Sequence, residues 1–326
     1  KIQRSPSRRL KKKDPIAAED YDYVLSSDVE LSGFTNLGNT CYMGAILAAL
    51  KSSPRFVNAL LQQAYPPSDK PSVFTALSTI LSSKGEVDPD RLKTVLAMHN
   101  SRYGDSNQED AHEFFLACIE LLHQDLSMNM PKPMNQLVPQ LFEGKIQNTY
   151  TCSSCNDKVH RPEMFRELGL SVASVTGPLS MQSLFASLFL KHEIQKKCDA
   201  CNALQPFSVQ PVLMKAPPIL VLQLKRFRFE MRRGTFRSIK VRAPVHVNLT
   251  LNVLDATYRI TCFVHHEGDD AMSGHYTTFV AEENGDWKIW NDAYTTTISK
   301  KNVASTIFSE ENKSDIYLAF YEKVSS

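Results

Sequence analysis

Long hydrophobic runs are missing from this 326-residue sequence. No apolar stretch approaches the roughly 20 residues that span a bilayer, and no signal-peptide pattern opens the chain. The chain also lacks a large excess of one charge. Its net charge is only +2, so overall charge does not favour nucleic acid binding. Internal repeats are also lacking. These absences argue against membrane and nucleic acid partners and predict a soluble, intracellular protein of the nucleus and/or cytoplasm.

The composition is that of a globular protein with a sizeable core. Hydrophobic residues make up 42% and charged residues 22%, and the length suffices for one large domain or two medium ones. The exception is the first 30 residues, which lack an apolar period and are basic, then acidic. Six cations crowd their start: Arg4, Arg8, Arg9, Lys11, Lys12 and Lys13. We interpret this segment as a solvated tail; a nuclear-import or phosphate-binding patch is the alternative.

The sequence contains seven cysteines, an odd number. Four of them form two Cys-x-x-Cys pairs, Cys152 with Cys155 and Cys198 with Cys201. In an intracellular chain this spacing favours a metal, and four thiolates suit one tetrahedral, structural Zn²⁺. Unpaired thiols or a redox pair are the alternative. Cys118 and Cys262 lie in apolar stretches and are expected to be small core residues.

The apolar spacing changes character along the chain. Helical spacing comes first, over 41–50, 71–83, 88–98 and 105–125. Thr40 or Asn39 is expected to cap the first of these helices. Strand patterns then follow at 142–152, 209–215, 219–229, 258–265, 276–282, 287–291 and 315–322. Helices followed by strands predict an α+β fold.

A cysteine and a distant histidine form the candidate catalytic pair. Cys41 opens the first predicted helix, whose N-terminus favours a thiolate. His275 begins a predicted strand and would take or share the thiol proton. Asn291 or Asp292, on the next strand, would orient the imidazole ring. Asn36 and Asn39 supply amide donors near the thiol, where an oxyanion would form.

Each of these residues also has a purely structural interpretation. A lone cysteine in an apolar helix is most often a core residue, and a histidine at a strand end is often satisfied by solvent. The polar Asn-Leu-Gly-Asn-Thr segment before Cys41 is unusual for core packing. Together with the matching histidine element, it favours a cysteine-nucleophile hydrolase.

Five segments in order resemble the ubiquitin-specific proteases, which are papain-like cysteine deubiquitinases. They are the cysteine box at 33–43, Gln-Glu-Asp-Ala-His-Glu-Phe-Phe at 108–115, Leu-Gln-Leu-Lys-Arg-Phe at 222–227, the histidine box from 274–276 through 291–292, and Ile-Tyr-Leu-Ala-Phe-Tyr at 316–321. The resemblance covers about residues 31–322. The sequence departs from the family at Gly44, Gln223 and Trp290, and it has Asn291 where the family often has aspartate.

The resemblance implies a role for each matching residue. Cys41 would be the nucleophile, His275 the base, Asn291 with Asp292 the orienting pair, and Asn36 the oxyanion donor. Substrate contacts would come from Gln108, Asp110, Glu113, Gly274 and Tyr276. Asp110 and Glu113 would face the arginines of the ubiquitin tail, with solvated helix-face charges as the alternative. The implied reaction is hydrolysis of the isopeptide or peptide bond after the last glycine of ubiquitin.

The resemblance also implies a layout and a zinc site. A basic and acidic tail (1–30) would precede a papain-like catalytic domain (31–326), divided into a thumb (31–140), fingers (141–215) and a palm (216–326). The zinc held by the four cysteines would tie the tips of the fingers. Partners would be ubiquitin and ubiquitinated proteins. Two other classes share these motifs: an inactive ubiquitin-binding module and a protease for a related modifier.

Overall fold

The computed structural model describes residues 29–66, 71–132, 134–173, 178–232, 235–270 and 273–324. The basic cluster of the predicted tail lies outside these residues. The end of that tail, however, has regular structure, because Val29 and Glu30 belong to strand β1 (Val29–Leu31), which pairs with β16 (Tyr294–Ile298). The described chain contains no helix with the length and apolarity needed to cross a membrane.

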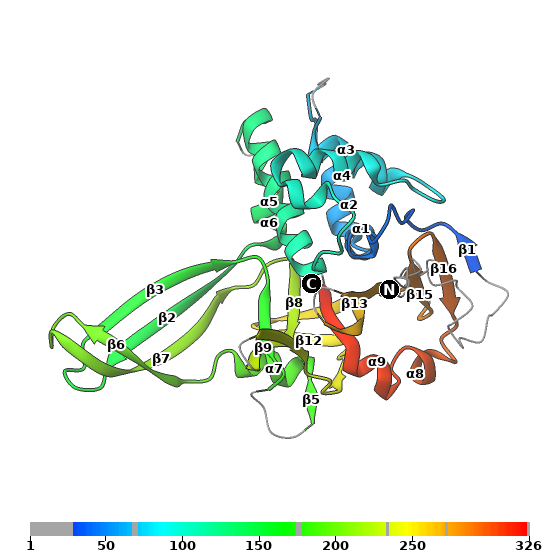
Figure 1. The fold of residues 1–326 in the computed structure, drawn as a ribbon. Helices are drawn as coiled ribbons and strands as arrows, with labels where there is room; N and C mark the ends of the chain where they lie inside the picture. The colour runs from blue at the N-terminus through cyan, green and yellow to red at the C-terminus, as the bar shows by residue number, and fades with distance from the viewer. Residues whose placement is uncertain are drawn as a thin grey trace, which may run out of the picture.

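Helices come first in the chain and pack together on one side of the main sheet (Figure 1). They are α1 (Cys41–Lys51), α2 (Pro54–Leu61), α3 (Val73–Ser82), α4 (Asp90–His99), η2 (Ser101–Tyr103), α5 (Ala111–Asn129), η3 (Met134–Gln136) and α6 (Leu137–Phe142). The predictions of α1, α3 and α4 are confirmed. Helix α2 was not predicted, although Ser53 caps it through Phe56 N and Pro54 begins it, as helix starts prefer.

The predicted helix over 105–125 begins six residues later than expected. Asp110 has an extended backbone, and its carboxylate accepts from the backbone N–H groups of His112 and Glu113. A side chain that caps the first turn in this way stops the helix from extending backwards. Residues 105–110 therefore form a loop. Thr40 holds the predicted cap position of α1 but forms no capping bond, because its hydroxyl accepts from Leu37 N instead.

One sheet organises the second half of the chain. Nine described strands belong to it, in the order β1-β16-β15-β14-β13-β17-β8-β4, with β12 also paired to β13. Those not yet given bounds are β4 (Leu168–Ser171), β8 (Ile219–Lys225), β12 (Thr250–Val253), β13 (Ala256–Asp270), β14 (Ser273–Ala281), β15 (Trp287–Asn291) and β17 (Ile316–Lys323). Cys262 and Val264 of β13 face the helices, while Phe263 packs in a second core on the other face.

A separate four-stranded sheet extends away from this body (Figure 1). Its order is β3-β2-β7-β6, and its strands are β2 (Gly144–Cys152), β3 (Lys158–Phe165), β6 (His192–Cys198) and β7 (Ala203–Lys215). The buried cluster near its far end is small, consisting of Cys152, Cys198 and Phe207. The far end of this sheet therefore has little apolar packing to hold it together.

Smaller elements lie around the main sheet. They are β5 (Leu179–Ser180), α7 (Met181–Ser187), β9 (Phe227–Arg232), β10 (Thr235–Lys240), β11 (Val245–His246), α8 (Val303–Thr306) and α9 (Glu310–Asp315). Strands β9 and β10 form a two-stranded hairpin, and β11 pairs with β5.

The single strand predicted over 219–229 is interrupted at Arg226. This side chain is fully buried, and its guanidinium donates to the carbonyls of Val241 (3.0 Å), Ala243 (2.8 Å) and Lys313 (2.8 Å). Burial lowers the pKa of Arg226 to about 10. The interruption separates β8 from the hairpin strand β9, and the arginine joins this point of the chain to two other segments.

Candidate active site

Cys41 is the first residue of α1 and is 4% exposed. The loop before it turns through two residues with positive φ, Gly38 and Asn39. Asn36 organises that loop, because its Oδ1 accepts from Gly38 N (3.0 Å) and Thr40 N (3.1 Å). A thiol at the N-terminus of an 11-residue helix is placed where negative charge is stabilised.

His275 reaches this thiol from strand β14. Its Nε2 lies 2.7 Å from Asn291 Oδ1, and its ring also hydrogen-bonds Cys41. An amide oxygen only accepts, so Nε2 carries a proton and the other ring nitrogen is left for the thiol. Burial alone lowers the pKa of His275, but the bond to Cys41 and the charge on its sulfur outweigh it, and the pKa is raised to about 9. The imidazole of His275 therefore favours its protonated form beside the Cys41 sulfur.

The two candidate orienting residues have different partners. Asn291 contacts the imidazole, whereas Asp292 Oδ2 accepts from Asn36 Nδ2 at 3.0 Å. The loops that carry this second contact lie very close together: a Cβ on Gly33 would lie 2.0 Å from the Asp292 carbonyl oxygen. Asp292 thus holds the amide predicted to bind the oxyanion. One hydrogen of that amide remains available for a substrate.

Gln108 joins the helical layer to the histidine strand. Its carboxamide forms two bonds with the backbone of Gly274, with Nε2 2.9 Å from Gly274 O and Gly274 N 3.1 Å from Oε1. The same Nε2 lies 3.7 Å from Cys41 Sγ. The sequence placed Gln108 among the substrate contacts and gave no sign of its contact with the candidate nucleophile Cys41. No local pattern carries that information, since the two residues are 67 positions apart.

The two carboxylates predicted to contact substrate, Asp110 and Glu113, differ in whether they are free to do so. Asp110 is committed to internal bonds, since it caps α5 and also accepts from Tyr317 OH at 2.6 Å. Glu113 has a side chain that is 56% exposed, and it pairs with Arg102 at 2.6 Å. Tyr276 is only 1% exposed and packs against His266, so its ring supports the strand from within the core.

The four predicted metal ligands come together at the far end of the four-stranded sheet. The sulfurs of Cys152, Cys155, Cys198 and Cys201 all lie within 4.8 Å of one another. Cys155 Sγ and Cys198 Sγ are 3.7 Å apart, close to the ~3.8 Å edge of a tetrahedron with zinc–sulfur bonds of about 2.3 Å. A backbone hydrogen bond from Cys155 lowers the pKa of Cys152 to about 7. This cluster has the donors and the geometry to bind a metal.

Comparisons with known proteins identify the family of the chain. Residues 32–321 match the family model described as ubiquitin carboxyl-terminal hydrolase. Ubiquitin carboxyl-terminal hydrolase 8 of Saccharomyces cerevisiae is 25% identical over 340 residues, which cover 89% of this chain and 70% of that protein. Ubiquitin carboxyl-terminal hydrolase 2 of Rattus norvegicus is 28% identical over 349 residues, covering 90% of this chain and 54% of that protein. Ubiquitin carboxyl-terminal hydrolase 25 of Arabidopsis thaliana, 25% identical, is matched over 45% of its length.

Solved structures give the same result. The chain superposes with a TM-score of 0.75 and 25% identity on the SAGA Ubp8/Sgf11/Sus1/Sgf73 DUB module bound to ubiquitin aldehyde, covering 90% of this chain and 70% of that one. A second match, also with a TM-score of 0.75, is the same module with a substituted Ubp8, bound to monoubiquitin; it is 26% identical and covers 90% and 69% of the two chains. The predicted α+β fold is confirmed. The chain belongs to the ubiquitin carboxyl-terminal hydrolases, a family of cysteine-type deubiquitinating enzymes.

Proposed function

We propose that this chain hydrolyses the isopeptide or peptide bond after the C-terminal glycine of ubiquitin. The observation that carries the proposal is the line of contacts from Cys41 through His275 to Asn291 at the start of α1. Membership of the family and similarity to ubiquitin-bound relatives support the choice of substrate. We also propose that the enzyme works inside the cell, in the nucleus and/or cytoplasm.

The site residues suffice for a two-step reaction. The Cys41 thiolate attacks the glycine carbonyl, and the oxyanion is met by the free hydrogen of Asn36 Nδ2 and by Gln108 Nε2. His275 then gives its proton to the leaving amine as the carbon–nitrogen bond breaks. A thioester to Cys41 remains. Neutral His275 removes a proton from water, which attacks the thioester and releases the carboxylate and the thiolate.

Asn291 and Asp292 have separate roles in this mechanism. Asn291 keeps the imidazole pointed at the thiol, and Asp292 keeps the Asn36 amide in place. Glu113 is the carboxylate best placed to meet a basic substrate tail, because it is exposed, whereas Asp110 is used internally. Reversing the charge of Glu113, as in Glu113→Lys, therefore tests substrate binding without removing the side chain that caps α5.

The four cysteines are proposed to hold one structural Zn²⁺. The donor set is closed, with four thiolates and no position for a substrate, so the metal would tie two turns together. In a sheet whose distal core consists of so few buried side chains, this tie would replace missing hydrophobic packing.

The direct test uses ubiquitin carrying a C-terminal fluorophore. The chain should release the fluorophore, and Cys41→Ala should abolish release while ubiquitin binding is retained. A panel of thiol-reactive probes built on ubiquitin and on related modifiers then identifies the substrate. Labelling of a different modifier in preference to ubiquitin would contradict the proposed substrate, and turnover by Cys41→Ala would contradict the nucleophile.

A further inference from the structure

Strand β13 extends beyond the start of β17, one of the strands that pair with it. Strand β17 begins at Ile316, whose partner on β13 is His265. Beyond that residue β13 continues to Asp270 and still pairs with β14, where Glu267 lies opposite His275. The part of β13 that supports the catalytic histidine therefore has a strand on one edge and no β17 on the other.

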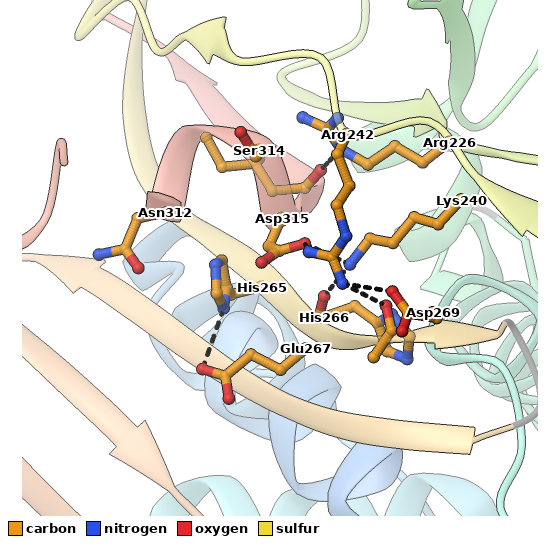
Figure 2. Close-up of polar contacts among 12 residues, drawn as sticks. Arg226, Lys240, Arg242, His265, His266, Glu267, Asp269, Asn312, Ser314 and Asp315 are labelled. Atoms are coloured by element: carbon orange, nitrogen blue, oxygen red, sulfur yellow. Dashed lines mark hydrogen bonds and ion pairs between the residues drawn. The ribbon is translucent and has the colours of Figure 1, made fainter. Parts of the chain in front are cut away.

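Two cationic side chains occupy that open edge (Figure 2). Lys240, the last residue of β10, donates from Nζ to the carbonyl oxygen of His266. Arg242 Nη2 lies 3.3 Å from the carbonyl oxygen of Gly268. His266 and Gly268 are two positions apart, the spacing at which carbonyls of a regular strand face one edge, and the pairing of β13 with β14 becomes irregular between Glu267 and Asp270. The two cations therefore donate to β13 carbonyls at the point where its regular pairing ends.

One buried carboxylate holds both cations in place. Asp315, the residue just before β17, accepts from Lys240 Nζ and lies 2.9 Å from Arg242 Nη1. The side chains of Lys240 and Asp315 are 1% and 6% exposed. With little water around them, the electrostatic attraction between the ammonium and the carboxylate is strong. Arg242 also reaches Asp269 at 2.7 Å, near the end of β13.

Residues 266–268 of β13 lie in close contact with β14, the strand that carries His275. A Cβ on Gly274 would lie 2.1 Å from the Glu267 carbonyl oxygen and 2.6 Å from His266 Nε2. The His266 ring also packs against Tyr276, with ring centroids 4.5 Å apart. Because these atoms are already in close contact, any shift of residues 266–268 would also displace Gly274 and His275.

We propose that Lys240 and Arg242, anchored by Asp315, are positioning residues for His275. Their side-chain donors replace the backbone donors that a longer β17 would have supplied, and they hold the β13–β14 hairpin in the register that brings His275 to Cys41. The inference rests on the proposed function for its kinetic readout. Its structural readout does not depend on that function.

The test centres on Arg242→Gln, because Arg242 is 46% exposed and its loss is compatible with folding. Arg228→Gln is the matched control: Arg228 lies on strand β9 of the adjoining hairpin and also has an acidic partner, Glu230, at 3.1 Å. Ubiquitin-fluorophore turnover is measured well below the melting temperature. We expect kcat of Arg242→Gln to fall roughly three- to tenfold with KM unchanged, as fits the loss of charge-assisted contacts in a half-exposed setting.

Hydrogen exchange supplies the independent readout. Amides of Gly268, Gly274 and His275 should exchange faster in Arg242→Gln, while those of β15 and the whole of Arg228→Gln remain as in the parent. Asp269→Asn, at a side chain that is 90% exposed, should produce a smaller change of the same kind. Arg242→Lys, which keeps the charge beside Asp315, should recover part of kcat.

Three outcomes would overturn the proposal. Lowered melting temperature with unchanged kcat would make Arg242 merely structural. Raised KM with unchanged kcat would make it a substrate contact. Unchanged exchange at Gly274 and His275 would show that the hairpin does not need it. If the parent chain fails to cleave ubiquitin, the proposed function fails, and the exchange data still decide the positioning role.

Discussion

At the scale of single residues, the active site assigns separate partners to two neighbouring side chains. Asn291 and Asp292 follow each other in the sequence, yet one contacts His275 and the other contacts Asn36. Successive residues of extended chain point in opposite directions, and Asp292 also has a positive φ that turns it out of the strand. The adjacent positions can therefore serve two different catalytic groups.

A double-mutant cycle tests this division. Asn36→Ala is expected to lower kcat about 10²-fold, the typical loss for one oxyanion donor. Asp292→Ala should cost less, and the combination of the two should be no slower than Asn36→Ala alone, because Asp292 acts through that amide. Asn291→Ala combined with Asn36→Ala should instead be slower than either single variant. Equal, independent losses for Asp292 and Asn36 would contradict the assignment.

The raised pKa of His275 predicts the alkaline limb of the pH profile. The leaving amine needs the proton of the imidazolium, so kcat/KM should fall as the pH rises through about 9. In Cys41→Ala the hydrogen bond and the charge of the sulfur, the main causes that raise this pKa, are gone, while burial still lowers it and Asn291 and Asp292 still raise it. Histidine NMR titration should then place the His275 pKa far below that of the parent. An unchanged value would mean that the thiol does not set it.

At the scale of elements, the four-stranded sheet depends on its far end. Its buried cluster there is small, and two of its members are candidate metal ligands, Cys152 and Cys198. Antiparallel strands joined by turns gain little stability without a packed face. A metal that closes both turns would supply what the missing core does not.

Zinc binding is therefore expected to stabilise this element. Elemental analysis should find about one zinc per chain, and Cys198→Ser should lower both zinc content and melting temperature, because binding couples to folding. Cys118→Ser, at a buried cysteine outside the cluster, is the matched control and should keep its zinc. A chelated chain that melts like the parent would contradict a structural metal.

At the scale of the whole molecule, the core contains two neutral histidines beside buried cations. Burial lowers the pKa of His265 to about 4 and that of His266 to about 3, and Lys240 and Arg226 lie close by. Unfolding frees both rings to bind protons at their ordinary pKa near 6.5. The unfolded state thus binds more protons between pH 6.5 and 4.

Stability should therefore fall as the pH falls through that window. Between pH 7 and pH 5 each histidine is expected to remove on the order of 2 kcal/mol from the free energy of unfolding. Urea titrations at both pH values measure the loss. His265→Gln should lose less stability on acidification than the parent, whatever its stability at pH 7. An equal loss in both would show that other groups drive acid unfolding.

The amino-acid sequence alone determined the identity of the chemical groups and most of the elements. Local signals suffice for these: apolar period for α1, α3 and α4, alternation for the strands, and spacing for the two Cys-x-x-Cys pairs. Errors arose where a contact distant in sequence decided a local outcome. The strand predicted over 219–229 is interrupted at Arg226, whose guanidinium donates hydrogen bonds to carbonyls of two other segments. Helix α5 begins later than predicted because the side chain of Asp110 caps its first turn.

Only the tertiary structure decided which groups act together. Gln108 meets Cys41 and Gly274, Asp292 meets Asn36, and Lys240 meets Asp315 across separations of 67 to 256 residues. Such contacts depend on where the chain ends a strand or packs a loop, and the periodicity of a segment says nothing about its neighbours in space. The sequence therefore determined which chemical groups this protein has, and the fold decided the partner of each candidate catalytic side chain.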